Sequence, residues 1–125
     1  MSRCVLYDLL LLFIAASLPR AAAAAELVMF ESQACARCAA WHAEIGPIYP
    51  KTREGQLAPL RRVDIHAPRP ADLELLGGIR FTPTFVLISD GREIGRIVGY
   101  LSEDFFWGQL NELLRRLEQS QGAAR

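Results

Sequence analysis

Four short apolar stretches punctuate the chain and predict β-strands. Residues 26–30, 60–65 and 84–89 are short and rich in β-branched, aromatic or other apolar residues. Asp90-Gly91 is a strong hairpin signal, so residues 93–98 should return as an antiparallel partner of the third strand.

Helical patterns separate these strands. Residues 35–45 are compatible with a helix, residues 71–76 with a short helix before Gly77-Gly78, and residues 51–59 read as a polar connection. Ser102 is a predicted N-cap, and apolar residues from Phe105 to Leu117 repeat at helical spacing. The order β-α-β-α-β-β-α predicts an α/β fold in which a mixed four-stranded sheet carries helices on both faces.

The N-terminus predicts an exported protein. Arg3 precedes an apolar run over residues 9–18, and residues 21–25 are alanines that offer cleavage sites. We expect a signal peptide over residues 1–25, a folded domain over 26–119, a flexible tail over 120–125, and a periplasmic location. The run is too short to span a bilayer stably, so the mature form should not cross the membrane; an uncleaved anchor or a buried N-terminal helix is the alternative.

Composition narrows the classes of function. The 14 basic and 14 acidic residues give no net charge and no basic patch, so nucleic acid is not an expected partner. Of the three cysteines, Cys4 falls in the predicted signal, which leaves Cys35 and Cys38 in the mature chain. A bridge between residues three apart closes a small loop and adds little stability, so this pair is better explained as reactive.

The sequence Cys35-Ala36-Arg37-Cys38 follows a strand and opens a helix. The positive end of a helix stabilises thiolate, and residues three apart on a helix are near enough to form a disulfide after a small adjustment. Arg37 beside Cys35 should stabilise the thiolate further; the alternative is an arginine that is simply solvated.

Metal-based alternatives have less support. Zinc usually takes four ligands, and besides the cysteines only His42 and His66 remain, while His42 reads as a surface or packing residue. A c-type haem site needs histidine directly after the second cysteine, where Ala39 stands. A metallochaperone that binds Cu(I) through two thiolates and a redox-sensing interaction module both stay open.

The chain resembles the thioredoxin superfamily over nearly all of the mature protein. The resemblance is carried by Cys35-Ala-Arg-Cys38, by Gly78-Ile79-Arg80-Phe81-Thr82-Pro83-Thr84, and by Val98-Gly99. Residues 41–52 and 81–107 look more narrowly like the exported thioredoxin-like proteins of bacterial sulfur-oxidation (Sox) gene clusters.

This resemblance implies roles for individual residues. Cys35 matches the cysteine that attacks a substrate disulfide, and Cys38 matches the resolving cysteine. Thr82-Pro83 matches a cis peptide bond packed against the dithiol, where the Thr82 backbone would pair with an extended substrate.

The sequence departs from the thioredoxin pattern at three places, which bear on the proton relay, the docking surface for thioredoxin reductase and the redox potential. Met29 stands where many thioredoxins have a buried aspartate, Ala34 replaces a tryptophan, and Ala36-Arg37 replaces Gly-Pro.

The expected function is therefore that of a periplasmic thiol–disulfide oxidoreductase with no cofactor besides its Cys35–Cys38 disulfide and no metal. Its expected partners are an exported protein with a reactive cysteine or disulfide, by the narrower resemblance a sulfur-oxidation carrier, and a membrane dithiol donor. The sequence leaves reductase, oxidase and isomerase directions open.

Overall fold

The computed structural model describes residues 25–123 of the chain. The predicted signal segment lies outside this range except for Ala25, which is buried. The elements follow in the order β1 (Glu26–Glu31), α1 (Ala36–Glu44), η1 (Tyr49–Lys51), α2 (Arg53–Leu57), β2 (Leu60–Asp64), η2 (Ala71–Leu73), β3 (Thr84–Ser89), β4 (Arg92–Val98) and α3 (Glu103–Ala123).

The sheet has the strand order β2-β1-β3-β4. β1 and β2 are parallel, whereas β3 pairs antiparallel with both β1 and β4. Asp90 and Gly91 both have positive φ, at 54° and 69°, as the predicted two-residue hairpin requires. The mixed four-stranded sheet of a thioredoxin-like α/β fold is thereby confirmed.

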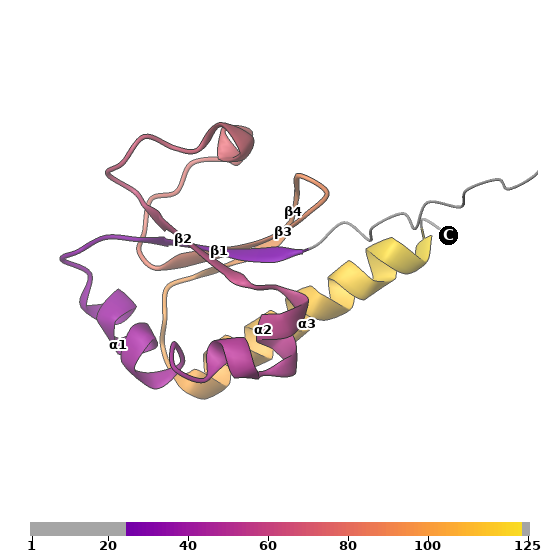
Figure 1. Ribbon diagram of the computed structural model, residues 1–125, viewed down its shortest axis with the longest axis horizontal. Helices are drawn as coiled ribbons and strands as arrows, with labels where there is room; N and C mark the ends of the chain where they lie inside the picture. Colours follow the sequence, from indigo (N-terminus) through magenta and orange to yellow (C-terminus); the bar gives the residue numbers. More distant parts are fainter. Residues whose placement is uncertain (1–24, 124–125) are drawn as a thin grey trace, which may run out of the picture.

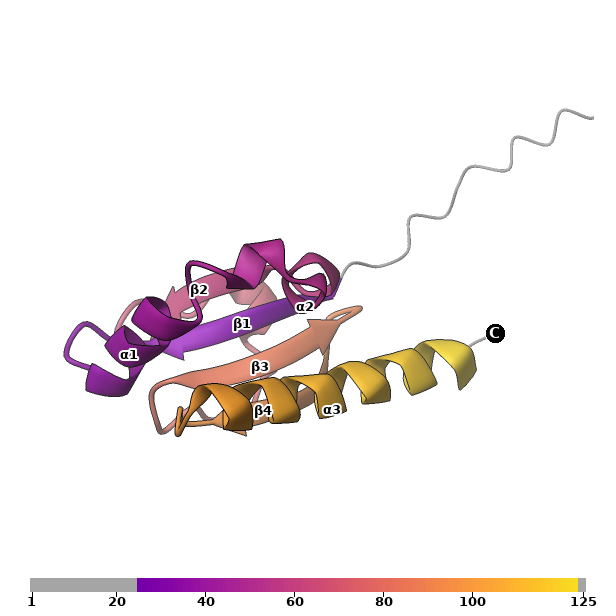
Figure 2. The ribbon, with the colours of Figure 1, turned by 90° about the horizontal axis from the view of Figure 1, so that it is seen from below.

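Two apolar layers enclose the sheet. The helices α1, α2 and α3 lie on one side of it, and the segment that contains η2 lies on the other (Figures 1 and 2). The larger core joins alternate residues of β1 and β3 to Trp41 of α1 and Phe106 of α3. On the opposite face, Leu73 of η2 packs against the remaining residues of the same strands. β3 is consequently buried along its whole length.

The connection predicted as purely polar over residues 51–59 is instead helical in part. The Thr52 hydroxyl donates to the Tyr49 carbonyl at 2.7 Å and accepts from the Gly55 N–H at 3.0 Å, so it caps α2. Tyr49 is buried and donates its own hydroxyl to the Ala58 carbonyl at 2.7 Å, which fixes the other end of this segment. The prediction failed because α2 is held by the side chains of Tyr49 and Thr52, which precede the helix in the sequence.

Two further helix predictions differ from the structure. The helix expected over residues 71–76 is a single 3-10 turn, because Pro70 before it offers no side-chain cap, whereas Thr52 caps the equally short α2. The last helix begins after Ser102 as predicted, with the Phe105 N–H donating to the Ser102 hydroxyl at 3.2 Å. It continues to Ala123, four residues into the segment expected to be a flexible tail.

Candidate functional site

A disulfide joins Cys35 and Cys38 at the start of α1, with the two Cα atoms 5.2 Å apart. Cys35 is the N-cap residue in an extended conformation, and its Sγ accepts a hydrogen bond from the Cys38 N–H at 3.0 Å. Cys35 is half-buried, whereas Cys38 is only 3% exposed. One sulfur is thus within reach of a partner and accepts a hydrogen bond from one helix N–H, and the other is held in the core.

The core holds this disulfide in place from beneath. The turn after β1 is closed by a hydrogen bond from the Cys35 N–H to the Ser32 carbonyl at 3.3 Å. One turn further along α1, Trp41 is fully buried and packs against the rings of Phe85 and Phe106, at centroid distances of 5.3 and 5.6 Å. This packing fixes α1 to the sheet and to α3, and so fixes the position of the disulfide at the start of α1.

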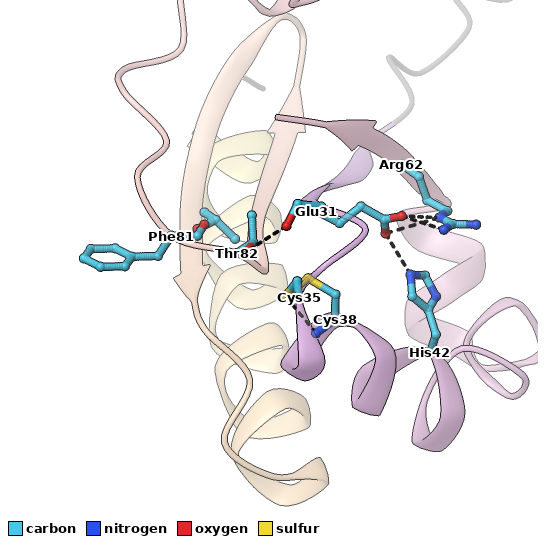
Figure 3. The surroundings of a disulfide bond; sticks show 9 residues. Glu31, Cys35, Cys38, His42, Arg62, Phe81 and Thr82 are labelled. Carbon is cyan, nitrogen blue, oxygen red and sulfur yellow. Dashed lines mark hydrogen bonds and ion pairs between the residues drawn. A yellow bond between two sulfur atoms is a disulfide. The ribbon is translucent and has the colours of Figure 1, made fainter. Parts of the chain in front are cut away.

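The loop before β3 lies beside the disulfide (Figure 3). Its Thr82–Pro83 peptide bond is cis, Pro83 is buried, and the Pro83 carbonyl accepts from the Gly99 N–H at 2.7 Å. The Thr82 hydroxyl lies 3.5 Å from the Ser32 hydroxyl, which links this loop to the turn that carries Cys35.

The loop has a backbone segment free to pair with another chain and an exposed aromatic ring. Within residues 25–123, no hydrogen bond to another backbone group engages the N–H or the carbonyl of Thr82. Phe81 is 66% exposed and points away from the protein (Figure 3). An unpaired backbone next to an exposed aromatic ring is suited to an added strand from another chain.

Arg37 lies on the surface between the two cysteines. Its side chain is exposed, and none of the ion pairs among the described residues includes it. The structure thus brings Cys35, Cys38, Thr82 and Pro83 together, and leaves Arg37 in solvent next to them.

A polar group that the sequence did not reveal lies on the other side of the disulfide. Glu31, at the end of β1, accepts from two guanidinium nitrogens of Arg62 and lies 2.7 Å from Nε2 of His42 (Figure 3). Burial acts to raise the pKa of Glu31, but hydrogen bonds from Arg62 and then His42 outweigh it and hold that pKa below its usual value. His42 is therefore part of an ionic network and not a plain surface residue.

These side chains and the disulfide line one hollow of about 320 Å³. We refer to it as the polar hollow, and its walls are formed by Glu31, Ser32, Gln33, Cys35, Cys38, Ala39, His42, Arg62 and Asp64. Met29 is not part of this wall and is fully buried in the same core cluster as Cys38. The core cluster that holds Cys38 therefore has methionine at position 29, and the ionisable groups lie in the wall of the polar hollow.

In the described part of the chain, no cluster of three or more histidine, cysteine, aspartate or glutamate side chains is arranged to hold a metal ion. Over the same residues, every helix is too short or too polar to cross a membrane.

The fold and the disulfide at the head of α1 are those of the thioredoxin class, whose members exchange thiols and disulfides. A family model for the thioredoxin-like domain matches residues 20–114, and the chain belongs to that family. No sequence among the curated proteins matches the chain.

Among solved structures, the chain is similar to the periplasmic thioredoxin SoxS from Paracoccus pantotrophus in its reduced form. The two are 47% identical with a TM-score of 0.71, over 74% of this chain and 98% of SoxS. This similarity confirms the narrower resemblance to Sox thioredoxins. A thioredoxin from Malassezia sympodialis is 24% identical with a TM-score of 0.55, over 73% of this chain and 76% of that one, and supports the fold alone.

Proposed function

We propose that the protein is a periplasmic thiol–disulfide oxidoreductase that reduces or exchanges disulfides on an exported partner protein, and that a sulfur-oxidation carrier is that partner. One observation carries this: an accessible sulfur at a helix N-terminus is bonded to a buried one beside a loop with an unpaired backbone. The 47% identity to a periplasmic Sox thioredoxin supports the compartment and the kind of partner.

The exchange proceeds in two steps. The Cys35 thiolate attacks one sulfur of the partner disulfide, that S–S bond breaks, and the partner's other sulfur leaves as a thiolate. Cys38 then attacks Cys35, the mixed disulfide breaks, and the second partner sulfur leaves. Two electrons pass to the partner, and a membrane dithiol donor returns the Cys35–Cys38 pair to its reduced form.

The surroundings of Cys35 favour the first step. The Cys38 N–H already donates to the Cys35 sulfur, and a thiolate accepts that hydrogen bond more strongly than a thiol does. Arg37 adds a solvent-exposed positive charge next to it. The Thr82 backbone and the Pro83 loop position an extended partner segment across the disulfide.

Trapping the mixed disulfide tests this function. The full chain is expressed in its native host as Cys38→Ser, which removes the resolving thiol and should leave an exported protein bound through Cys35. The adduct should disappear on treatment with dithiothreitol and be absent from Cys35→Ser, the matched control. Failure to recover any adduct, when Cys35 is shown to alkylate freely, would contradict the proposal.

The direction of exchange is tested in the same cells. Rapid acid quenching followed by thiol alkylation should show the wild-type Cys35–Cys38 pair mostly reduced, and oxidised when the membrane donor is removed. A pair that stays oxidised with the donor present would indicate an oxidase instead. N-terminal sequencing of the exported protein tests cleavage of residues 1–25.

A further inference from the structure

The buried Cys38 thiol needs a route by which it can exchange its proton. Cys38 must lose a proton to attack Cys35, and it must gain one when the disulfide is reduced. It is 3% exposed and lies in a core cluster of buried apolar residues that includes Met29, which has no ionisable group. Burial among apolar side chains disfavours the thiolate, so an unassisted Cys38 would resolve the mixed disulfide slowly.

The polar hollow offers the missing route to a base. Cys38 forms part of its wall, and the ionisable groups that face it are Glu31 from β1, His42 from α1, and Arg62 and Asp64 from β2. Arginine stays protonated in proteins, and Asp64 accepts the His66 N–H at 2.8 Å at the outer end of β2. Glu31 is held by Arg62, which makes it a weak base. His42 is the remaining candidate, and histidine is the side chain that ordinarily titrates near neutral pH.

The Glu31 contact also fixes the form of the imidazole. An ionised carboxylate can only accept, so Nε2 of His42 carries the proton that points to Glu31, and Nδ1 is left as the basic nitrogen. Arg62 in turn holds the carboxylate through bonds of 3.1 and 2.5 Å. A base oriented by a carboxylate next to a nucleophilic sulfur follows the general arrangement of activated nucleophiles.

We propose that His42 is the proton acceptor and donor for Cys38, acting through water in the polar hollow, and that Glu31 and Arg62 are positioning residues. The hollow has room for several water molecules between polar walls. In the resolving step the proton of the Cys38 thiol passes to Nδ1, and the Cys38 sulfur bonds to the Cys35 sulfur. The bond from Cys35 to the partner breaks, and the partner's sulfur leaves with the electron pair. When the disulfide is reduced again, the imidazolium returns the proton to Cys38.

This inference rests on the proposed exchange activity, and one assay separates the two. The reduced wild-type protein is mixed with dithiobis(nitrobenzoate) in a stopped-flow instrument, and the coloured thiolate product is followed. The attack by Cys35 releases the first equivalent, and the attack by Cys38 releases the second. Absence of the first release would contradict the exchange activity itself, whatever the behaviour of His42.

His42→Gln should affect only the second release. We expect the first release to change by less than about twofold and the second to slow by about tenfold to a hundredfold. This is at or below the lower end of the roughly 10²–10⁴-fold that a general base usually contributes, because water in the polar hollow can still accept the proton when the imidazole is absent. His66→Gln is the matched control, because His66 is the other histidine of the chain and does not line the polar hollow. It should leave both releases unchanged.

Two readouts distinguish a base from a residue that only supports the fold. In His42→Ala, imidazole added to the buffer should restore the second release in proportion to its concentration and leave the first unaffected. In Glu31→Gln, the second release should slow and the first should not, because a neutral amide can donate as well as accept and no longer fixes the His42 proton on Nε2. An unaltered second release in His42→Gln, or equal slowing of both releases without imidazole rescue, would overturn the proposal.

Discussion

Replacing Phe81 by alanine should weaken exchange with a protein partner and leave exchange with a small disulfide intact. The ring stands next to the Thr82–Pro83 loop and is 66% exposed, so it contributes little to the folded core. A partner strand laid along Thr82 would cover this ring. The effect of the substitution should therefore appear only when a macromolecule is bound.

The size of the effect follows from the exposed area. A phenylalanine side chain buries roughly 150–250 Å² when fully covered, so an exposure of two thirds leaves roughly 100–160 Å² for a partner. At about 25 cal/mol per Å², complete burial would contribute about 2.5–4 kcal/mol. Alanine keeps part of this contact and an interface seldom covers a ring fully, so we expect a loss of about 1.5 kcal/mol, or about tenfold in kcat/KM.

The assay compares Phe81→Ala with the wild type on the trapped partner and on dithiobis(nitrobenzoate). Leu75→Ala is the matched control, since Leu75 is 97% exposed and follows η2, which packs on the sheet face opposite α1. It should leave both rates unchanged. Equal kcat/KM for the partner in Phe81→Ala and wild type would refute the assignment of this loop as the docking surface. An equal loss with both substrates would point to damage at Cys35 instead.

Three other substitutions test the remaining physical claims. Arg37→Ala should raise the pKa of the Cys35 thiol in a thiolate absorbance titration and Arg37→Lys should not; identical titrations would show that Arg37 is merely solvated. Thr52→Ala should destabilise the oxidised protein by about 1 kcal/mol in urea, through loss of the α2 cap, and Thr52→Ser should recover most of it. Arg62→Gln should lower the urea midpoint at neutral pH. Because the folded-state pKa of Glu31 lies below its usual value, this contribution exists above the ordinary carboxyl pKa of about 4 and is lost as pH falls through the folded pKa. The two midpoints should therefore converge in acid, and a constant gap between them would contradict the linkage.

The strands and the cysteine site could be predicted because their signals are local. The Asp90-Gly91 turn specifies its own backbone, and the dithiol is recognised by spacing and by position after a strand. The start of the last helix was likewise predicted from its N-cap residue, Ser102. These features depend on residues within a few positions of one another, so periodicity and turn chemistry are sufficient.

The polar group beside the disulfide could not be predicted, because it exists only through tertiary contacts. In the parallel register of β1 and β2, Met29 lies opposite Arg62 and Glu31 lies opposite Asp64. The Arg62 side chain therefore reaches diagonally to Glu31, a relation that neither strand contains by itself. His42 offered one signal, its position four residues after Cys38 on the same helix, but the carboxylate that engages it is set by the fold.

Replacing a buried carboxylate by Met29 changes the energetics of the site as well as its chemistry. An ionised group in the core costs several kcal/mol unless it is fully paired, whereas Met29 packs there without such a penalty. The Glu31 side chain is only 15% exposed, but it opens onto the polar hollow and is bound by Arg62, so its ionisation is compatible with a stable fold. Figure 3 shows Phe81 on one side of the disulfide and Glu31, His42 and Arg62 on the other. In the proposed mechanism, partner docking at Phe81 and proton exchange with His42 therefore use opposite sides of the disulfide.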